Sequence, residues 1–250
     1  MGIEGMWRKF LDRAKSNPVE DYDANAYEEL RHVAYEVVFG GKAANVVVEA
    51  AVTPPFPVGV HLFNEPPKLS IIMPGGASAT PTQPRNWTTL ATMGMSNERM
   101  PNPPAHVRPE MGRVELLFHV SWRALDATPD LIHFCADMLM FFAKYPFLEE
   151  RLLAPGHIVP VCVIGQGMID FLGDPSVSRL LVMPAPPDAP GGDLEEHLEL
   201  GGDPVSFLAL VPITEEELQF YRKHGVAELL EQGELPGVYD GPRRSSVPAT

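Results

Sequence analysis

The segment of residues 128–144 restricts the fold more than any other part of the sequence. The segment begins with residues that suit the start of a helix. Thr128 can cap it, Pro129 suits the first helical position, and the acid Asp130 would lie near the positive end of the helix dipole. The residues that follow are apolar on nearly all sides, and Pro146 is expected to end the helix. A helix with this pattern is buried on most sides, so we expect it to pack on a sheet as the central helix.

Strand-like segments occur on both sides of this helix. Residues 113–120 (RVELLFHV) alternate between an apolar face and a partly polar face. Another run begins at Trp87 and reaches a turn at Gly94. Because consecutive strands lack helices between them, we expect an α+β fold with a mixed, largely antiparallel central sheet and helices packed against it. Further strands are predicted at residues 45–52, 69–73, 158–164, 177–183 and 205–211.

The remaining helices indicate a single domain. Residues 24–38 carry apolar residues at helical spacing, and residues 214–224 begin with a capping box formed by Thr214 and Glu217. A short helix at 226–232 is expected to close the domain. The segment after it has few apolar residues and is expected to be disordered. The predicted organisation is an N-terminal helical extension (1–23), one domain (24–232) and a disordered C-terminal tail (233–250), with proline-rich connections at 53–86 and 101–109.

Charge and composition exclude several classes of protein. The 250 residues carry a net charge of −14, which repels the phosphate backbone of nucleic acids. The same charge attracts a basic protein partner, although it also serves simply to keep a protein in solution. The first fifteen residues lack the apolar core of a signal peptide, and the apolar stretch 131–142 is too short and too polar to span a bilayer. The two cysteines form no disulfide framework. We therefore expect a cytoplasmic protein.

The familiar catalytic and cofactor motifs are incomplete in this chain. Around Ser96, a nucleophile elbow would need a glycine where Glu98 stands. A dinucleotide fingerprint beginning at residues 165–167 would place Asp170 against a pyrophosphate. The eight histidines form no HExxH motif and the cysteines no CxxC pair, so we expect no metal and no cofactor. We expect His133 to be a hydrogen-bonded core residue and His157 to be exposed.

Three segments in order resemble the suppressor-of-fused domain, over roughly residues 25–232. The segments are Thr92–Ser96; Arg113–Leu116, followed by Trp122 and a helix that ends in Phe142–Pro146; and Pro155–Ile158, followed by Phe207–Ile213 and Glu216. The chain differs from the family at residues 119–121, where members carry a Leu-Pro-like step, and in a longer connection at 53–86. The chain is too short for the second domain of the animal member, so none of that member's binding residues is transferred.

This resemblance implies a non-enzymatic binding domain. Bacterial members are similar to immunity proteins, which neutralise a cognate toxin by binding it. Many nuclease toxins are basic, so an acidic chain would associate with them quickly. We therefore expect another protein as partner, such as a basic toxin, and neither nucleic acid nor membrane.

The candidate partner-binding or motif residues come from the same segments. They are Thr92, Gly94, Ser96, Glu115, Trp122 and His157. Structural interpretations are open as well: Gly94 would form a turn, Trp122 would pack in the core, and Glu115 would form an ion pair with Arg113. Two other functions remain open at this point: a hydrolase with a pocket around Ser96 or His157, and a scaffold that binds a partner strand at a sheet edge.

Overall fold

The computed structural model describes most of the chain from residue 87 onward and a few segments before it. The described residues are 31, 34–35, 45–49, 58–63, 87–101, 112–163, 167–172, 174–185, 198–200, 203–233 and 235–247. Of the predicted helix 24–38, Arg31, Ala34 and Tyr35 are described, and they are helical. The predicted extension 1–23 and strand 69–73 lie outside the described residues.

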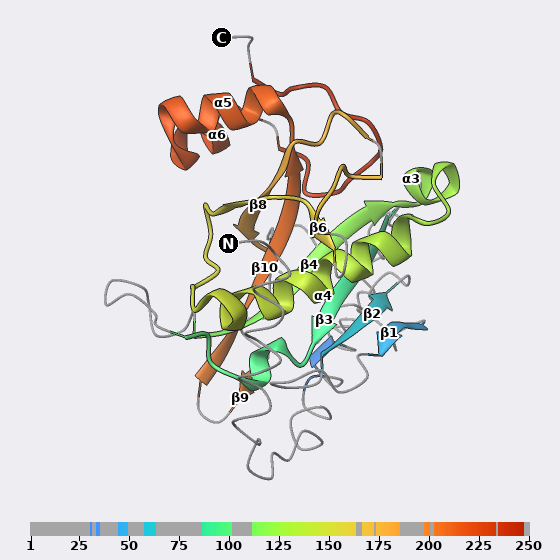
Figure 1. Cartoon of the computed structure of the whole chain (residues 1–250), viewed down its shortest axis with the longest axis vertical. Coiled ribbons are helices and arrows are strands. Elements are labelled where there is room, and N and C mark those ends of the chain that lie inside the picture. The colour runs from blue at the N-terminus through green and yellow to red at the C-terminus, as the bar shows by residue number, and fades with distance from the viewer. Residues whose placement is uncertain are drawn as a thin grey trace, which may run out of the picture.

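A twisted mixed sheet forms the centre of the protein (Figure 1). Its order is β1 (Asn45–Glu49), β2 (Gly59–Phe63), β3 (Trp87–Met93), β4 (Arg113–Ser121), β10 (Asp203–Ile213), β8 (Arg179–Pro184) and β5 (Ile158–Val159). The β4–β10 pair is parallel, and the other pairs along this path are antiparallel. Strand β9 (Glu199–Leu200) pairs with the start of β10. The predicted α+β class with a largely antiparallel sheet is confirmed.

The central helix α4 (Leu131–Glu149) lies across one face of this sheet (Figure 1). Apolar side chains of β4 point toward it, as the alternation of that strand predicted. By length and composition α4 could cross a membrane, but 67% of its apolar window is buried inside the protein. Helix α4 is therefore a core helix. The β4 residues of this layer are Val114, Leu116, Phe118 and Val120.

The two ends of α4 differ from the prediction. The helix continues past Pro146 to Glu149, and the C-cap residue Glu150 takes the left-handed conformation with φ of 53°. Pro146 is buried, and packing of this turn outweighs the one backbone hydrogen bond that a proline removes. At the start, Thr128 closes a short helix that sequence reasoning missed, α3 (Trp122–Ala127), and does not cap α4. Helix α3 is capped by the Ser121 hydroxyl, which accepts from the Ala124 N–H at 3.1 Å.

The predicted strand 158–164 is divided into two. Strand β5 joins the edge of the main sheet, whereas β6 (Cys162–Val163) pairs with β7 (Gly167–Met168) in a separate two-stranded sheet. Pro160 lies between β5 and β6, and a proline has no N–H to donate to a strand ladder. This break explains why one apolar run serves two sheets.

The opposite face of the sheet carries a second core. Ala34 and Tyr35 pack there against Leu117 and Phe207, so the predicted N-terminal helix contacts this face through its described residues. The rings of Tyr35 and Phe207 meet edge to face, with centroids 5.8 Å apart. Helices therefore contact both faces of the sheet.

Helices α5 (Glu215–His224) and α6 (Val226–Gln232) follow β10 at one end of the sheet (Figure 1). The predicted capping box is confirmed, because Thr214 accepts from the Glu217 N–H and the Glu217 carboxylate accepts from the Thr214 N–H. Leu218, Phe220 and Leu229 form a third apolar cluster with residues of β8 and β10.

The C-terminal segment is ordered, in contrast to the disordered tail that the sequence predicted. Residues 235–247, here named the strap, run back along the body of the protein (Figure 1). Tyr239 and Val247 are buried, and Tyr239 forms a bridge with Val120 of β4. A few anchored side chains hold the strap in place, so its low apolar content was a poor guide.

Candidate functional site

Four of the six candidate residues meet at one buried carboxylate. Glu115 of β4 accepts hydrogen bonds from the Thr92 hydroxyl at 2.6 Å, the Gly94 N–H at 2.9 Å, and the Ser96 N–H and hydroxyl at 3.0 and 2.6 Å. The Glu115 side chain is fully buried. Strands β3 and β4 are neighbours, so the strand pairing brings the start of β4 against the turn that follows β3. Both oxygens of the carboxylate are occupied by donors of the protein.

The turn around this carboxylate has further support. Gly94 takes φ of 118°, a conformation that residues with a side chain rarely adopt, and it precedes the 3₁₀ turn η1 (Met95–Asn97). The Arg113 guanidinium donates to the backbone carbonyls of Ser96 and Asn97 at 2.9 and 2.6 Å. Arg113 and Glu115, both among the described residues, therefore do not form the ion pair that the sequence suggested. Each of them instead forms hydrogen bonds with the turn that follows β3.

Tyr35 and Arg31 of the N-terminal helix form hydrogen bonds with the same turn and with the end of β3. The Tyr35 hydroxyl donates to the Thr92 carbonyl at 2.7 Å, and Arg31 donates to the Asn97 side chain. Burial raises the pKa of Tyr35 well above its ordinary value, and the nearby Glu115 carboxylate raises it further. The phenol therefore stays neutral and acts as a hydrogen-bond donor.

Burial sets the chemistry available to Ser96. Its side chain is fully buried, and its hydroxyl donates to Glu115. A serine nucleophile has to reach its substrate and be activated by a base that accepts its proton, usually a histidine. The Thr92–Ser96 turn therefore supports the fold, and the hydrolase alternative gains no support from Ser96.

The other two candidates lie apart from this turn. His157 is exposed, as expected, and its ring Nδ1 accepts from the Ala154 N–H at 3.3 Å. It precedes β5, and β10 and β8 lie between β4 and β5 in the sheet, so the structure does not bring His157 to Glu115. Trp122 is 44% exposed at the start of α3, so the core-packing interpretation of this residue is wrong.

Trp122 is one of five exposed residues on two consecutive helices, which together are here named the α3–α4 surface. Trp122 and Asp126 lie four residues apart on α3, and Asp130, His133 and Asp137 recur at helical spacing at the start of α4. All five side chains are exposed, which corrects the expectation that His133 is a core residue. Sequence reasoning missed this surface because α3 was not predicted. The spacing of the three aspartates was the signal that could have found it.

Among the described residues, no group of histidine, cysteine and acidic side chains could hold a metal ion. Cys135 and Cys162 are both free and buried. Burial raises the pKa of the Cys135 thiol well above its ordinary value and that of Cys162 to about 11. Neither thiol has the low pKa of a reactive cysteine.

With this geometry established, comparison with known proteins identifies the family. The family model described as "Suppressor of fused protein (SUFU)" matches residues 66–240. The chain belongs to this family. The SUFU match includes Glu115, Trp122 and His157, and it ends at Asp240, within the strap.

A solved structure shows the same fold. The chain is similar to a chain of "the Sufu-Fu complex crystal structure", with a TM-score of 0.52 and 14% sequence identity. The similarity covers 89% of this chain and 91% of that chain. No curated protein matches the sequence. At this identity the likeness supports the fold, and the function has to be argued from this chain's own residues.

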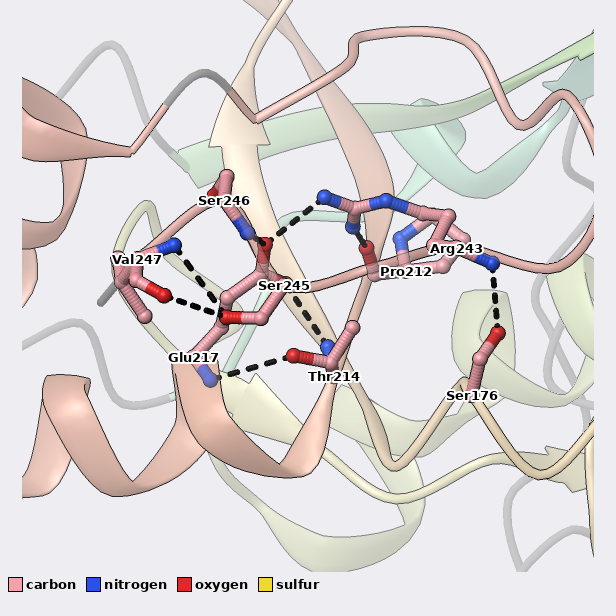
Figure 2. Close-up of polar contacts among 8 residues, drawn as sticks. All are labelled: Ser176, Pro212, Thr214, Glu217, Arg243, Ser245, Ser246 and Val247. Carbon is pink, nitrogen blue, oxygen red and sulfur yellow. Dashed lines mark hydrogen bonds and ion pairs between the residues drawn. The ribbon is translucent and has the colours of Figure 1, made fainter. Parts of the chain in front are cut away.

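The strap of this SUFU chain contributes polar contacts that the sequence did not predict. Asp240 accepts from the Arg123 guanidinium at 2.5 Å and from the Ser121 hydroxyl, next to Trp122. Tyr239 donates to Asp174 at 2.6 Å. At the far end of the strap, Arg243 and Ser246 bind Glu217 of α5 (Figure 2).

Proposed function

We propose that this chain is a non-catalytic, cytoplasmic binding domain that neutralises or regulates a basic partner protein, as an immunity protein does with its toxin. The α3–α4 surface is the observation that supports this proposal best. The SUFU family membership agrees with it, and the solved neighbour is described as a Sufu-Fu complex.

An exposed tryptophan on helices that also carry exposed carboxylates suits a protein interface. Tryptophan is among the residues that contribute most to binding, because its large ring is desolvated in the pocket of a partner. Asp126, Asp130 and Asp137 follow it in the sequence and are exposed. Buried side chains around a fold-supporting turn, as at Glu115, offer no such contact.

The charge of this surface favours a basic partner. The neighbouring cation Arg123 is paired with both carboxylate oxygens of Asp240, at 3.1 and 2.5 Å, so its charge is largely compensated. The three exposed aspartates then contribute negative charge there, in a chain with a net charge of −14. Complementary charge speeds the encounter with a basic protein and weakens as salt screens it.

The test begins with a tagged pull-down from the native host at low salt, with the bound proteins identified by mass spectrometry. Capture alone does not support the proposal. The partner is then purified and titrated calorimetrically with the wild type, Trp122→Ala and the control Leu230→Ala, whose side chain is 42% exposed on α6. We expect Trp122→Ala to raise the Kd at least about 30-fold and Leu230→Ala to leave it unchanged.

A second variant tests the charge. Asp126→Asn, Asp130→Asn and Asp137→Asn combined should lower the association rate and reduce its dependence on salt. Equal affinity of the wild type and Trp122→Ala would contradict the proposed surface. The absence of any basic partner in repeated low-salt trials would contradict the proposed function itself.

A further inference from the structure

A buried carboxylate holds the end of the strap. Oε1 of Glu217 accepts from the Arg243 guanidinium at 2.9 Å, and from the N–H and hydroxyl of Ser246 at 3.0 and 2.6 Å (Figure 2). Glu217 is fully buried, and the Arg243 side chain is 9% exposed. Arg243 also donates to the Pro212 carbonyl, and its N–H donates to the Ser176 hydroxyl at 2.9 Å. We name these contacts of Glu217, Arg243 and Ser246 the latch.

The two serines of this segment differ in their contacts. The Ser246 hydroxyl is bound to the Glu217 carboxylate, whereas the Ser245 hydroxyl bonds only locally, with the backbone of Val247 at 3.1 and 3.3 Å. Both serines are half-buried. A change of charge at Ser246 therefore acts on the latch directly, and the same change at Ser245 does not.

The sequence of the latch suits a modifying enzyme. Arg243 lies three residues before Ser246 and Arg244 lies two residues before it. The apolar Val247 follows directly. Protein kinases with acidic substrate grooves select serines by this arrangement of charge. Arg244 is exposed, so it is available for recognition while Arg243 is engaged in the latch. The segment also lies beyond residue 240, where the family match ends.

We propose that Ser246 is a phosphorylation site and that its phosphorylation opens the latch. The Ser246 oxygen attacks the γ-phosphorus of a nucleoside triphosphate held by a protein kinase. The new O–P bond replaces the bond to the β–γ bridging oxygen, the nucleoside diphosphate leaves, and a carboxylate of the kinase takes the hydroxyl proton. The inference concerns the strap and does not rest on the proposed partner-binding function.

Electrostatics explain why the phosphorylated strap cannot return to its place. Phosphorylation adds a charge of about −1.5 to −2 and removes the hydroxyl proton that Glu217 accepts. The two anionic groups would then share a buried site with one guanidinium, which is destabilising because like charges repel and both lose hydration. Outside the latch, the phosphate can pair with Arg243 and Arg244 in water. Val247 leaves its apolar cluster when the strap detaches.

Hydrogen–deuterium exchange measures the latch without reference to activity. The N–H groups of Arg243 and Ser246 are hydrogen-bonded donors, so they exchange slowly in the latched strap. The protein is treated with MgATP and a serine kinase that selects serines preceded by arginines. The modified residue is then located by mass spectrometry. We expect phosphate on Ser246, less of it in Arg244→Ala, and exchange of residues 243–247 at least about tenfold faster in the phosphorylated protein.

Matched variants that carry a charge without kinase treatment control for misfolding and for side effects of the kinase reaction. Ser246→Glu should accelerate exchange of the strap, whereas Ser245→Glu should not, and peptides from β4 and α4 should remain protected in both. Three results would overturn the proposal: no modification of the folded protein, phosphate on Ser245 in place of Ser246, or equal strap protection before and after phosphorylation of Ser246.

Discussion

Replacement of Glu115 by glutamine tests the role of the buried carboxylate. Glu115→Gln keeps the size of the side chain and one carbonyl oxygen, which can still accept from Gly94 and Ser96. The new amide nitrogen faces the Thr92 hydroxyl, which donated to the carboxylate at 2.6 Å. The Thr92 oxygen accepts from the Leu116 N–H at 2.8 Å and can also accept from the new amide, but the Thr92 hydroxyl proton then loses its acceptor.

The size of the expected loss of stability in Glu115→Gln follows from these contacts. A hydrogen bond to a charged acceptor contributes about 1.5–3 kcal/mol, and the remaining bonds weaken when the acceptor becomes neutral. The amide is cheaper to bury than a carboxylate, which offsets part of the loss. We therefore expect Glu115→Gln to lower the free energy of unfolding by about 2–3 kcal/mol.

Urea denaturation followed by circular dichroism measures this difference. With a slope near 3 kcal/mol per M, the midpoint should fall by roughly 1 M while the slope is unchanged. The control is Asp126→Asn, an exposed carboxylate that should change stability by less than about 0.5 kcal/mol. A midpoint for Glu115→Gln within about 0.2 M of the wild type would refute the argument that a charged acceptor holds this turn.

Three further predictions concern the backbone, the thiols and alkaline pH. Gly94→Ala should cost about 1–3 kcal/mol in urea denaturation because φ is 118°, whereas Gly112→Ala, whose new Cβ meets no atom within 4 Å, should be near neutral. Cys135 and Cys162 should resist a thiol reagent at about pH 8 in the folded protein and react once it is unfolded, since burial raises both pKa values. Burial, and secondarily Asp174, raises the pKa of Tyr239 far above its ordinary value. Its contribution to stability is therefore complete below the unfolded value of about 10 and declines as the pH rises further, and Tyr239→Phe should flatten the fall of stability in an alkaline titration.

The residue patterns predicted the elements that depend on local spacing. The alternation of residues 113–120 identified β4 and its core-facing side, and the capping box at Thr214 and Glu217 located the start of α5. The resemblance likewise led to Gly94 and Ser96, which the structure brings to Glu115. The strand and the capping box were accessible because each is determined by residues a few positions apart, whereas Gly94 and Ser96 came from the resemblance.

Short or interrupted elements were harder to predict. Helix α3 has six residues, too few to form by itself, and depends on its cap at Ser121 and its place at the end of β4. The end of α4 was misplaced because Pro146 is tolerated where the surrounding core favours the helix. In both cases tertiary packing overrides the local preference.

The sequence by itself determined the class of sheet, the central helix and the groups able to carry charge, because periodicity and residue type are local properties. Only the tertiary structure decided which of those groups meet. It placed Glu115 against the turn that follows β3, left Trp122 44% exposed, and joined Arg243 to Glu217 across 26 residues of chain. The physical reason is that strand pairing and burial fix contacts between distant segments, and a few buried side chains and hydrogen bonds can anchor a strap whose composition suggests disorder.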